Sequence, residues 1–179
     1  LELCRDIAQK FNNDFKVDNF FKIPEPLIQK EFSRIMSLRD GVKKMSKSEL
    51  SDLSRINLTD DKDQMINKIK KAKTDTLPLP STSVDLEKRP EAKNLMGIYS
   101  SLTDVSLDDT INKFSGKNFS EFKEILSQVM VDEISPISSE IKKLLGEKKY
   151  LDKILLEGAK KADKIASEKV KKIQELVGF

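Results

Sequence analysis

The amino-acid sequence predicts a mainly α-helical chain, in which a truncated piece of an α/β domain is followed by an antiparallel bundle of helices. Two observations support this prediction. Apolar residues recur at helical spacing through most of residues 90–177. By contrast, Arg34–Leu38 is typical of a short strand and runs straight into a lysine-rich loop, and α/β sheets place ligand sites beyond the carboxyl ends of strands. One strand cannot form a sheet, so we expect its partner strands to precede Leu1 in a longer protein.

Composition narrows the possible functions. The chain has 179 residues, no His and a single Cys, Cys4, which excludes a disulfide framework, a Cys/His zinc site and a histidine general base. A lone cysteine favours a reducing, cytoplasmic compartment. The formal net charge of +3 means that an anionic partner would have to be met by local basic patches. No apolar run approaches the ~18–20 residues that span a membrane, so we expect no membrane partner.

The first half of the chain contains two predicted helices. Apolar residues at helical spacing predict one over about Leu1–Phe15. A second is expected after an N-cap at Thr59 or Asp60, with its lysines on the solvated side and at the C-terminal end, where they complement the helix dipole. The proline-containing stretch Thr74–Arg89 has no apolar period and is predicted to be a linker.

The second half is predicted to be helical throughout. Pro90 suits the first position of a helix, and Ser106 begins a capping-box pattern for the next one. Ser120 is expected to cap a long helix that Pro136 kinks. The last helix is predicted over about Lys149–Val177, with its apolar stripe in the core of the bundle.

The lysine-rich loop Gly41–Glu49 is the strongest candidate site. Lys44 and Lys47 are compact cations on long stems, three residues apart, which is suitable for a phosphate chain. Ser46 and Ser48 add hydroxyl donors, and Gly41 lets the backbone bend. Because Lys43–Ser48 has no apolar residue except Met45, the segment Lys43–Glu49 is expected to be mobile until it closes on its ligand. The alternative interpretation is an ordinary solvated loop of Lys and Ser.

Lys44–Ser48 spells K-M-S-K-S, the signature of class I aminoacyl-tRNA synthetases, and the chain resembles the bacterial tryptophanyl-tRNA synthetases of that class. Further segments match that family in order along the chain: Leu1–Ala8, Phe21–Pro26, Arg34–Leu38, Asp60–Asp61, Lys68–Lys70, Thr74–Asp75, Asn94–Ser100 and Gly158–Ala162. Glu49 stands where the family usually has Asp. The family's H-I-G-H-type segment, tryptophan pocket and Gly-x-Asp-Gln stretch are absent, so the resemblance is to its C-terminal half. Tyrosyl-tRNA synthetases are a poorer match, because their bacterial forms usually depart from K-M-S-K-S.

The resemblance implies how the chain is divided into domains and which reaction the complete enzyme catalyses. Residues 1–77 would be the C-terminal remnant of a Rossmann-type catalytic domain, and residues 78–179 a linker and a helical domain of the tRNA anticodon-binding type. ATP, with Mg²⁺ carried by its phosphates, would activate tryptophan to the adenylate for transfer to tRNA(Trp), and no metal site in the protein is expected. Lys47 first and Lys44 second would stabilise the departing pyrophosphate, assisted by Ser46 and Ser48. The backbone of Ile35 and Met45 would hold adenine. The complete enzyme would be a homodimer, and this chain alone would be inactive.

The residues are also compatible with two other functions. The basic faces of the C-terminal helices suit a non-catalytic tRNA-binding module. The small-residue stripe Gly158, Ala162 and Ala166 would let another helix approach closely and suits a dimerisation module. A P-loop enzyme is not supported, since no Gly-x-x-x-x-Gly-Lys-[Ser/Thr] motif occurs.

Overall fold

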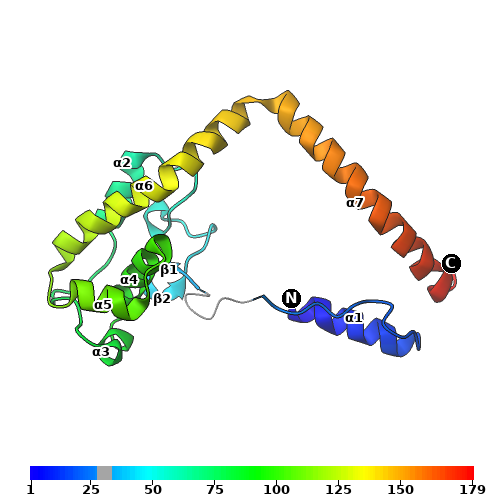
Figure 1. The fold of residues 1–179 in the computed structure, drawn as a ribbon, viewed down its shortest axis with the longest axis horizontal. Coiled ribbons are helices and arrows are strands. Elements are labelled where there is room, and N and C mark those ends of the chain that lie inside the picture. Colours follow the sequence, from blue (N-terminus) through cyan, green and yellow to red (C-terminus); the bar gives the residue numbers. More distant parts are fainter. Residues whose placement is uncertain (28–33) are drawn as a thin grey trace. The chain divides into compact units, whose positions relative to one another are not determined.

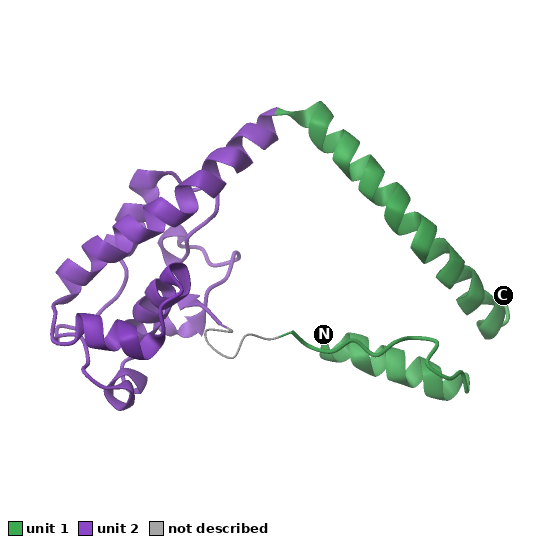
Figure 2. Cartoon of the chain, viewed as in Figure 1, with its two compact units in different colours: residues 1–29, 147–179 green, residues 30–146 purple. Residues whose placement is uncertain are grey.

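The computed structural model describes residues 1–27 and 34–179, so the part of the catalytic-domain prediction that falls on residues 28–33 lies outside the described residues. The chain forms two compact units, residues 1–29 with 147–179, and residues 30–146 (Figure 2). The predicted, mainly helical character is confirmed, and the described strands form one small antiparallel sheet. None of the described helices is both long enough and apolar enough to cross a membrane.

Unit 2, residues 30–146, contains the sheet and most of the helices (Figure 1). Its elements in chain order are β1 (Met36–Ser37), β2 (Asp40–Lys44), a 3-10 turn (Asp52–Ser54), α2 (Lys62–Lys70), α3 (Ser83–Glu87), α4 (Pro90–Thr103), α5 (Leu107–Phe114) and α6 (Phe119–Gly146). Helices α2 and α4 both pack on α6. At the centre, the rings of Tyr99, Phe114 and Phe122 contact one another, and Phe114 and Phe122 are fully buried.

The sheet differs from the expected lone strand. β1 pairs antiparallel with β2 through a tight turn at Leu38 and Arg39, so its partner is the first part of the predicted loop. The expectation that every partner strand precedes Leu1 is therefore wrong for this pair. The sequence prediction missed β2 because Asp40–Lys44 is mostly polar and its burial is confined to its first half.

Several helix boundaries are confirmed and others are corrected. Pro90 opens α4, and the Ser106 hydroxyl caps α5 by accepting from the Asp109 amide at 3.1 Å. Helix α2 is capped by Asp61 in a capping box with Gln64, rather than by Thr59 or Asp60. The cap at the start of α6 comes from the Asn118 side chain, which accepts from the amide of Glu121 at 2.8 Å, and not from Ser120.

The predicted linker Thr74–Arg89 is partly helical, because it contains α3. Thr82 caps this short helix by accepting from the Asp85 amide, and Leu86 is the one residue of α3 that is buried. Because α3 is short and buries a single apolar side chain, its sequence shows no helical repeat of apolar residues.

Unit 1, residues 1–29 and 147–179, contains α1 (Glu2–Asp14) and α7 (Lys148–Val177). Phe11, Phe15, Phe20 and Phe21 form an aromatic cluster at the end of α1. The Lys169 ammonium of α7 lies 3.8 Å from the centroid of the Phe20 ring and donates to the Phe20 carbonyl oxygen. The apolar stripe of α7 was expected in a core, but no residue of α7 is buried. Its Ile165 and Leu155 are 76% and 70% exposed.

Helix α6 shows where the core ends. Its buried residues run from Phe119 to Val131, followed only by Ser138, and Leu145 near its C-terminal end is 58% exposed. The helix continues through Pro136. Of the predicted bundle, α4, α5 and the first half of α6 therefore share one core in unit 2, whereas the stripe beyond them is exposed.

Candidate functional site

The lysine-rich loop Gly41–Glu49, called the lysine loop below, begins within β2 and continues beyond its end. Hydrogen bonding between the two sides of the hairpin extends one residue past the strands. The Met45 amide donates to the Ile35 carbonyl oxygen at 3.0 Å, which places these two residues side by side. Both side chains are half-buried and pack against the core of unit 2. The structure thus brings together the two residues that were predicted to hold adenine, although Lys44 belongs to β2 rather than to the loop.

Helix α4 fixes the position of the hairpin. The Asn94 side-chain oxygen accepts from the Met36 amide, and its amide nitrogen donates to the Met36 carbonyl oxygen, both at 2.9 Å. A Cβ atom on Gly41 would lie 2.6 Å from the backbone of Pro90 and Glu91, so β2 approaches the first turn of α4 closely. Asn94 was not predicted as a site residue; the available signal was an amide side chain beside the apolar stripe of this helix.

The tip of the loop is a turn stabilised by its own hydroxyl groups. The Ser46 and Ser48 oxygens lie 2.9 Å apart, and the Ser48 amide donates to the Ser46 hydroxyl at 3.3 Å. Lys44 and Lys47 are exposed, and neither forms an ion pair with a carboxylate of the described residues. Lys43 is the lysine of this hairpin that faces a carboxylate, that of Asp40 at 3.9 Å. The arrangement presents two unneutralised ammonium groups and two hydroxyl groups at one exposed turn.

A charged network lies behind the loop. Lys68 of α2 is 3% exposed, and its ammonium contacts Asp52 at 2.6 Å and Asp60 at 2.7 Å. Asn57 donates to both carboxylates through its side chain, at 3.1 and 3.2 Å. The Lys68 hydrogen bond, followed by that of Asn57, lowers the pKa of the Asp52 carboxyl group from its ordinary value. The expectation that Lys68 lies on the solvated side of its helix is wrong, because the carboxylates of Asp52 and Asp60, which precede the helix, pair with its buried ammonium.

The direction of the Asp52 shift predicts how stability depends on pH. A carboxyl group whose pKa is lowered by folding stabilises the fold fully above its unfolded pKa, and the contribution is lost as pH falls through the lower folded value. Asp52→Asn should therefore reduce the loss of unfolding free energy between about pH 5 and pH 2. Urea unfolding of the chain and of the variant at several pH values measures this. A variant that loses stability as steeply as the parent would contradict the prediction.

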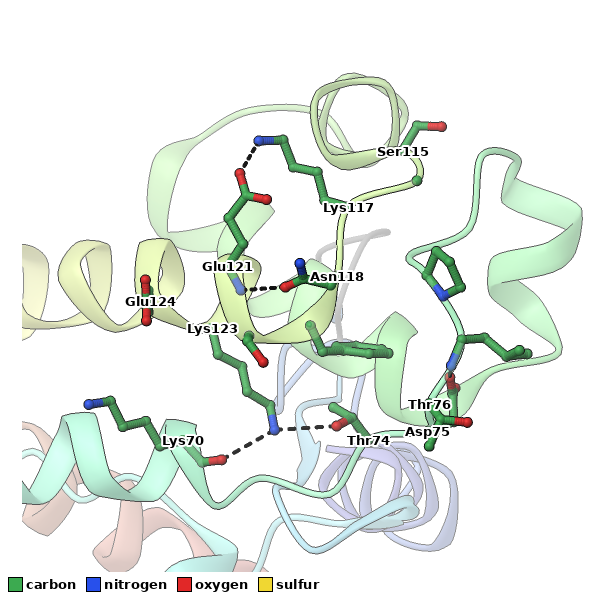
Figure 3. A pocket seen from close by; sticks show the side chains of 15 residues that line it. Lys70, Thr74, Asp75, Thr76, Ser115, Lys117, Asn118, Glu121, Lys123 and Glu124 are labelled. Atoms are coloured by element: carbon green, nitrogen blue, oxygen red, sulfur yellow. Dashed lines mark hydrogen bonds and ion pairs between the residues drawn. The ribbon is translucent and has the colours of Figure 1, made fainter.

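A cavity of about 960 Å³ lies elsewhere in unit 2, between residues 74–78 and the start of α6 (Figure 3). The Lys123 ammonium closes one side by donating to the Ala72 carbonyl oxygen at 2.6 Å, and burial, with the nearby Arg39, lowers its pKa. Lys117 pairs with Glu121 at the other side. None of the predicted site residues lines this cavity. Within the described ranges, no group of acidic or Cys residues is placed to hold a metal ion.

Comparisons with known proteins identify the family to which the chain is similar. Residues 1–148 match the family described as tRNA synthetases class I (W and Y). The tryptophan–tRNA ligase of Caulobacter vibrioides is 48% identical over 179 residues, covering all of this chain and 52% of that protein. The corresponding ligase of Rickettsia felis is 50% identical and is covered to 53%. The chain thus spans about half the length of the curated relatives it matches.

Solved structures agree with these matches. The crystal structure of tryptophanyl-tRNA synthetase from Mycoplasma pneumoniae superimposes with a TM-score of 0.81 at 25% identity, over 99% of this chain and 54% of that one. That of the Campylobacter jejuni enzyme, complexed with ADP and tryptophan, gives a TM-score of 0.66 at 28% identity, over 99% of this chain and 53% of that one.

Proposed function

Since the chain belongs to the class I tRNA synthetase family of the tryptophan and tyrosine enzymes, we propose that it is the C-terminal part of a tryptophan–tRNA ligase. The complete enzyme would act in the cytoplasm as a homodimer, convert ATP and tryptophan to tryptophanyl-adenylate and pyrophosphate, and transfer the acyl group to tRNA(Trp). Residues 1–77 would complete a Rossmann-type catalytic domain, and residues 78–179 a helical domain that binds tRNA. The observation that carries the proposal is the exposed K-M-S-K-S turn, in a chain about half identical to such ligases.

The chemistry follows from the loop. Attack of the tryptophan carboxylate on the α-phosphate develops charge on the departing pyrophosphate, and two cations that reach that charge stabilise the transition state more than ground-state ATP. We assign this role to Lys47 first and Lys44 second. The hydroxyl groups of Ser46 and Ser48, now bonded to each other, would donate to phosphate oxygens once ATP is bound. ATP would bring Mg²⁺ on its phosphates.

Adenine would be held by the backbone next to the hairpin. The Ile35 carbonyl and the Met45 amide already bond to each other. The other backbone polar groups of these two residues are the Ile35 amide and the Met45 carbonyl oxygen. We expect the edge of adenine to form its hydrogen bonds with these two groups. Backbone groups fixed by strand pairing distinguish adenine from other bases by the order of donor and acceptor.

The test is tryptophan-dependent exchange of pyrophosphate into ATP. It requires a complete enzyme that contains this chain, either its natural full-length protein or a chimera with the N-terminal half of the Caulobacter vibrioides relative. We expect exchange with tryptophan and not with tyrosine, and no exchange by residues 1–179 alone. Exchange driven by tyrosine would assign the chain to the other branch of the family, and exchange by the chain alone would show that the site is complete without further sequence.

Loop closure gives a second measurement. Because the Met45 amide is bonded within the hairpin and the Glu49 carbonyl oxygen accepts from Arg55, the segment expected to move is Ser46–Ser48. Its amides should exchange with solvent freely in the unliganded complete enzyme and become protected when ATP and a non-reactive tryptophan analogue are bound. Equal and strong protection in both states would indicate a rigid phosphate cradle.

One observation favours a second function, non-catalytic tRNA binding. Helix α7 has no buried residue, and it carries exposed lysines, among them Lys160, Lys161, Lys164, Lys171 and Lys172. Binding of tRNA by the isolated chain, weakening steeply with salt and unaffected by ATP, would support this function.

A further inference from the structure

The buried ammonium of Lys68 calls for an explanation beyond stability. Lys is almost never fully buried unless it is paired, and Lys68 is 3% exposed between two carboxylates. A buried ion pair adds little net stability compared with apolar residues of the same volume, because both charges lose their water. In some proteins a buried pair instead fixes the positions of the groups it joins.

The groups joined to Lys68 lead to the end of the lysine loop. Asp52 contacts Lys68 through one oxygen, and through the other it contacts the Arg55 guanidinium at 3.0 Å. Arg55 then donates to the carbonyl oxygen of Glu49 at 2.9 Å and to that of Ser51 at 3.5 Å. Glu49 directly follows the K-M-S-K-S turn. An unbroken series of contacts therefore runs from the core face of α2 to the residue at which the loop ends.

The two ends of the loop are thus held by different helices. The first end is fixed through the hairpin by Asn94 of α4, and the last end through Arg55 by Lys68 of α2. Between them, the Ser46 and Ser48 hydroxyl groups bond to each other, and the Ser46 carbonyl oxygen accepts from the Glu49 amide at 3.4 Å, while Lys47 forms no ion pair with the described carboxylates. The position available to Lys47 is limited by where these two anchors lie.

We propose that Lys68 and Arg55 are positioning residues for Lys47: through Asp52 they fix the backbone of Glu49–Ser51, and so determine where the Lys47 ammonium lies when the loop closes on phosphate. The proposal rests on the adenylate-forming function proposed above. The network suits this task because its two cations and two carboxylates, Lys68, Arg55, Asp52 and Asp60, balance in charge. It therefore anchors the loop without placing an unpaired carboxylate beside the phosphate.

Arg55→Met in the complete enzyme tests the proposal. Its partner Asp52 is 54% exposed and keeps Lys68 as a second partner, so the loss of Arg55 leaves no isolated buried charge. A displacement of about 1 Å in a catalytic group can cost up to 100-fold in rate, so we expect kcat for adenylate formation to fall about 10-fold with KM for tryptophan unchanged. Arg55→Lys, which retains the charge but not the planar fork, should recover only part of the rate.

The decisive measurement is a double-mutant cycle with Lys47→Ala. If Arg55 acts by positioning Lys47, Arg55→Met should change the rate less than about 2-fold once Lys47 is absent. A merely structural role would lower the folded fraction equally in both backgrounds, and the two effects would multiply. The paired substitution Lys68→Met with Asp60→Asn, which removes both charges of the buried pair, should repeat the pattern of Arg55→Met.

Arg89→Met is the matched control. Arg89 is 14% exposed, pairs with Asp75 and donates to the Leu77 carbonyl oxygen, and none of its hydrogen bonds or ion pairs with the described residues involves the lysine loop. It should lower the midpoint of thermal unfolding without any coupling to Lys47. Two results would overturn the inference in a parent enzyme that shows exchange activity. One is that the effects of Arg55→Met and Lys47→Ala multiply, and the other is that Arg55→Met leaves the rate unchanged. A parent without tryptophan-dependent exchange would overturn the proposed function, and the inference with it. If Arg55→Met does not fold, Arg55→Lys takes its place in the cycle.

Discussion

Lys47→Ala in the complete enzyme should slow formation of tryptophanyl-adenylate by about 10²–10³-fold, the usual effect of removing one preorganised group that stabilises transition-state charge. Tryptophan affinity should hardly change, because the lost interaction belongs to the transition state. The structure supports a large effect, since Lys47 is exposed and no carboxylate of the described residues competes with phosphate for its ammonium. Single-turnover measurement of adenylate formation separates this step from transfer to tRNA.

The matched control is Lys43→Ala, in the same hairpin. Lys43 is exposed like Lys47, but it faces the Asp40 carboxylate and lies before the K-M-S-K-S residues. Its loss should change the rate by less than about 3-fold, as expected for an exposed ion pair. Lys47→Arg should not restore the full rate, because a planar guanidinium replaces a compact ammonium. A Lys47→Ala enzyme that kept its turnover and lost tryptophan affinity would assign Lys47 to a different role.

Local signals in the sequence predicted much of the helical half correctly. Pro90 and Ser106 each mark the start of a helix, because their effect depends only on the backbone within the next turn. The predicted start of the last helix is one residue from that of α7. The family resemblance, which rests on the order of segments, agrees with the comparisons.

Features that depend on tertiary contact were not predictable in this way. Lys68 lies three residues after Met65, on the buried side of α2, but the sequence does not show that Asp52 and Asp60 pair with its ammonium there; Lys70, on another side of the helix, is exposed. The stripe of α7 has the period of a core helix, yet periodicity states only which residues share a face and not whether another element covers it. Likewise, Asn94 becomes a site residue because β1 lies against α4.

For the candidate site, the sequence supplied the residues and the structure supplied their supports. Lys44, Lys47, Ser46 and Ser48 were identified from residue type and spacing, and their roles stay predictions. Asn94 bonds to Met36 of the hairpin that leads into the loop, 58 positions away, and Arg55 bonds to Glu49 at the end of the loop, 6 positions away. No local pattern indicates such contacts, which is why the positioning of the loop had to be derived from the fold.

Gly41→Ala should be among the most damaging single changes in unit 2, with an expected loss of about 2–3 kcal/mol in unfolding free energy. The new Cβ would lie 2.6 Å from backbone atoms of Pro90 and Glu91 and 2.8 Å from the Pro90 carbonyl oxygen. Backbone in the first turn of a helix cannot move aside as a flexible side chain can. Either the hairpin separates from α4 or the start of α4 shifts, and urea unfolding of the chain measures the cost.

The same substitution also tests how the loop is placed. If β2 moves away from α4, the bonds between Asn94 and Met36 weaken, and the first end of the lysine loop moves with them. Under conditions in which the variant remains folded, adenylate formation should therefore fall by up to about 100-fold. Gly158→Ala is the control, because nothing lies within 4 Å of its added Cβ in the interior of α7. It should stabilise the chain by about 0.5–1 kcal/mol and leave the rate unchanged. A Gly41→Ala enzyme that unfolds at the parent's urea concentration and keeps the parent's rate would mean that the hairpin does not depend on its contact with α4.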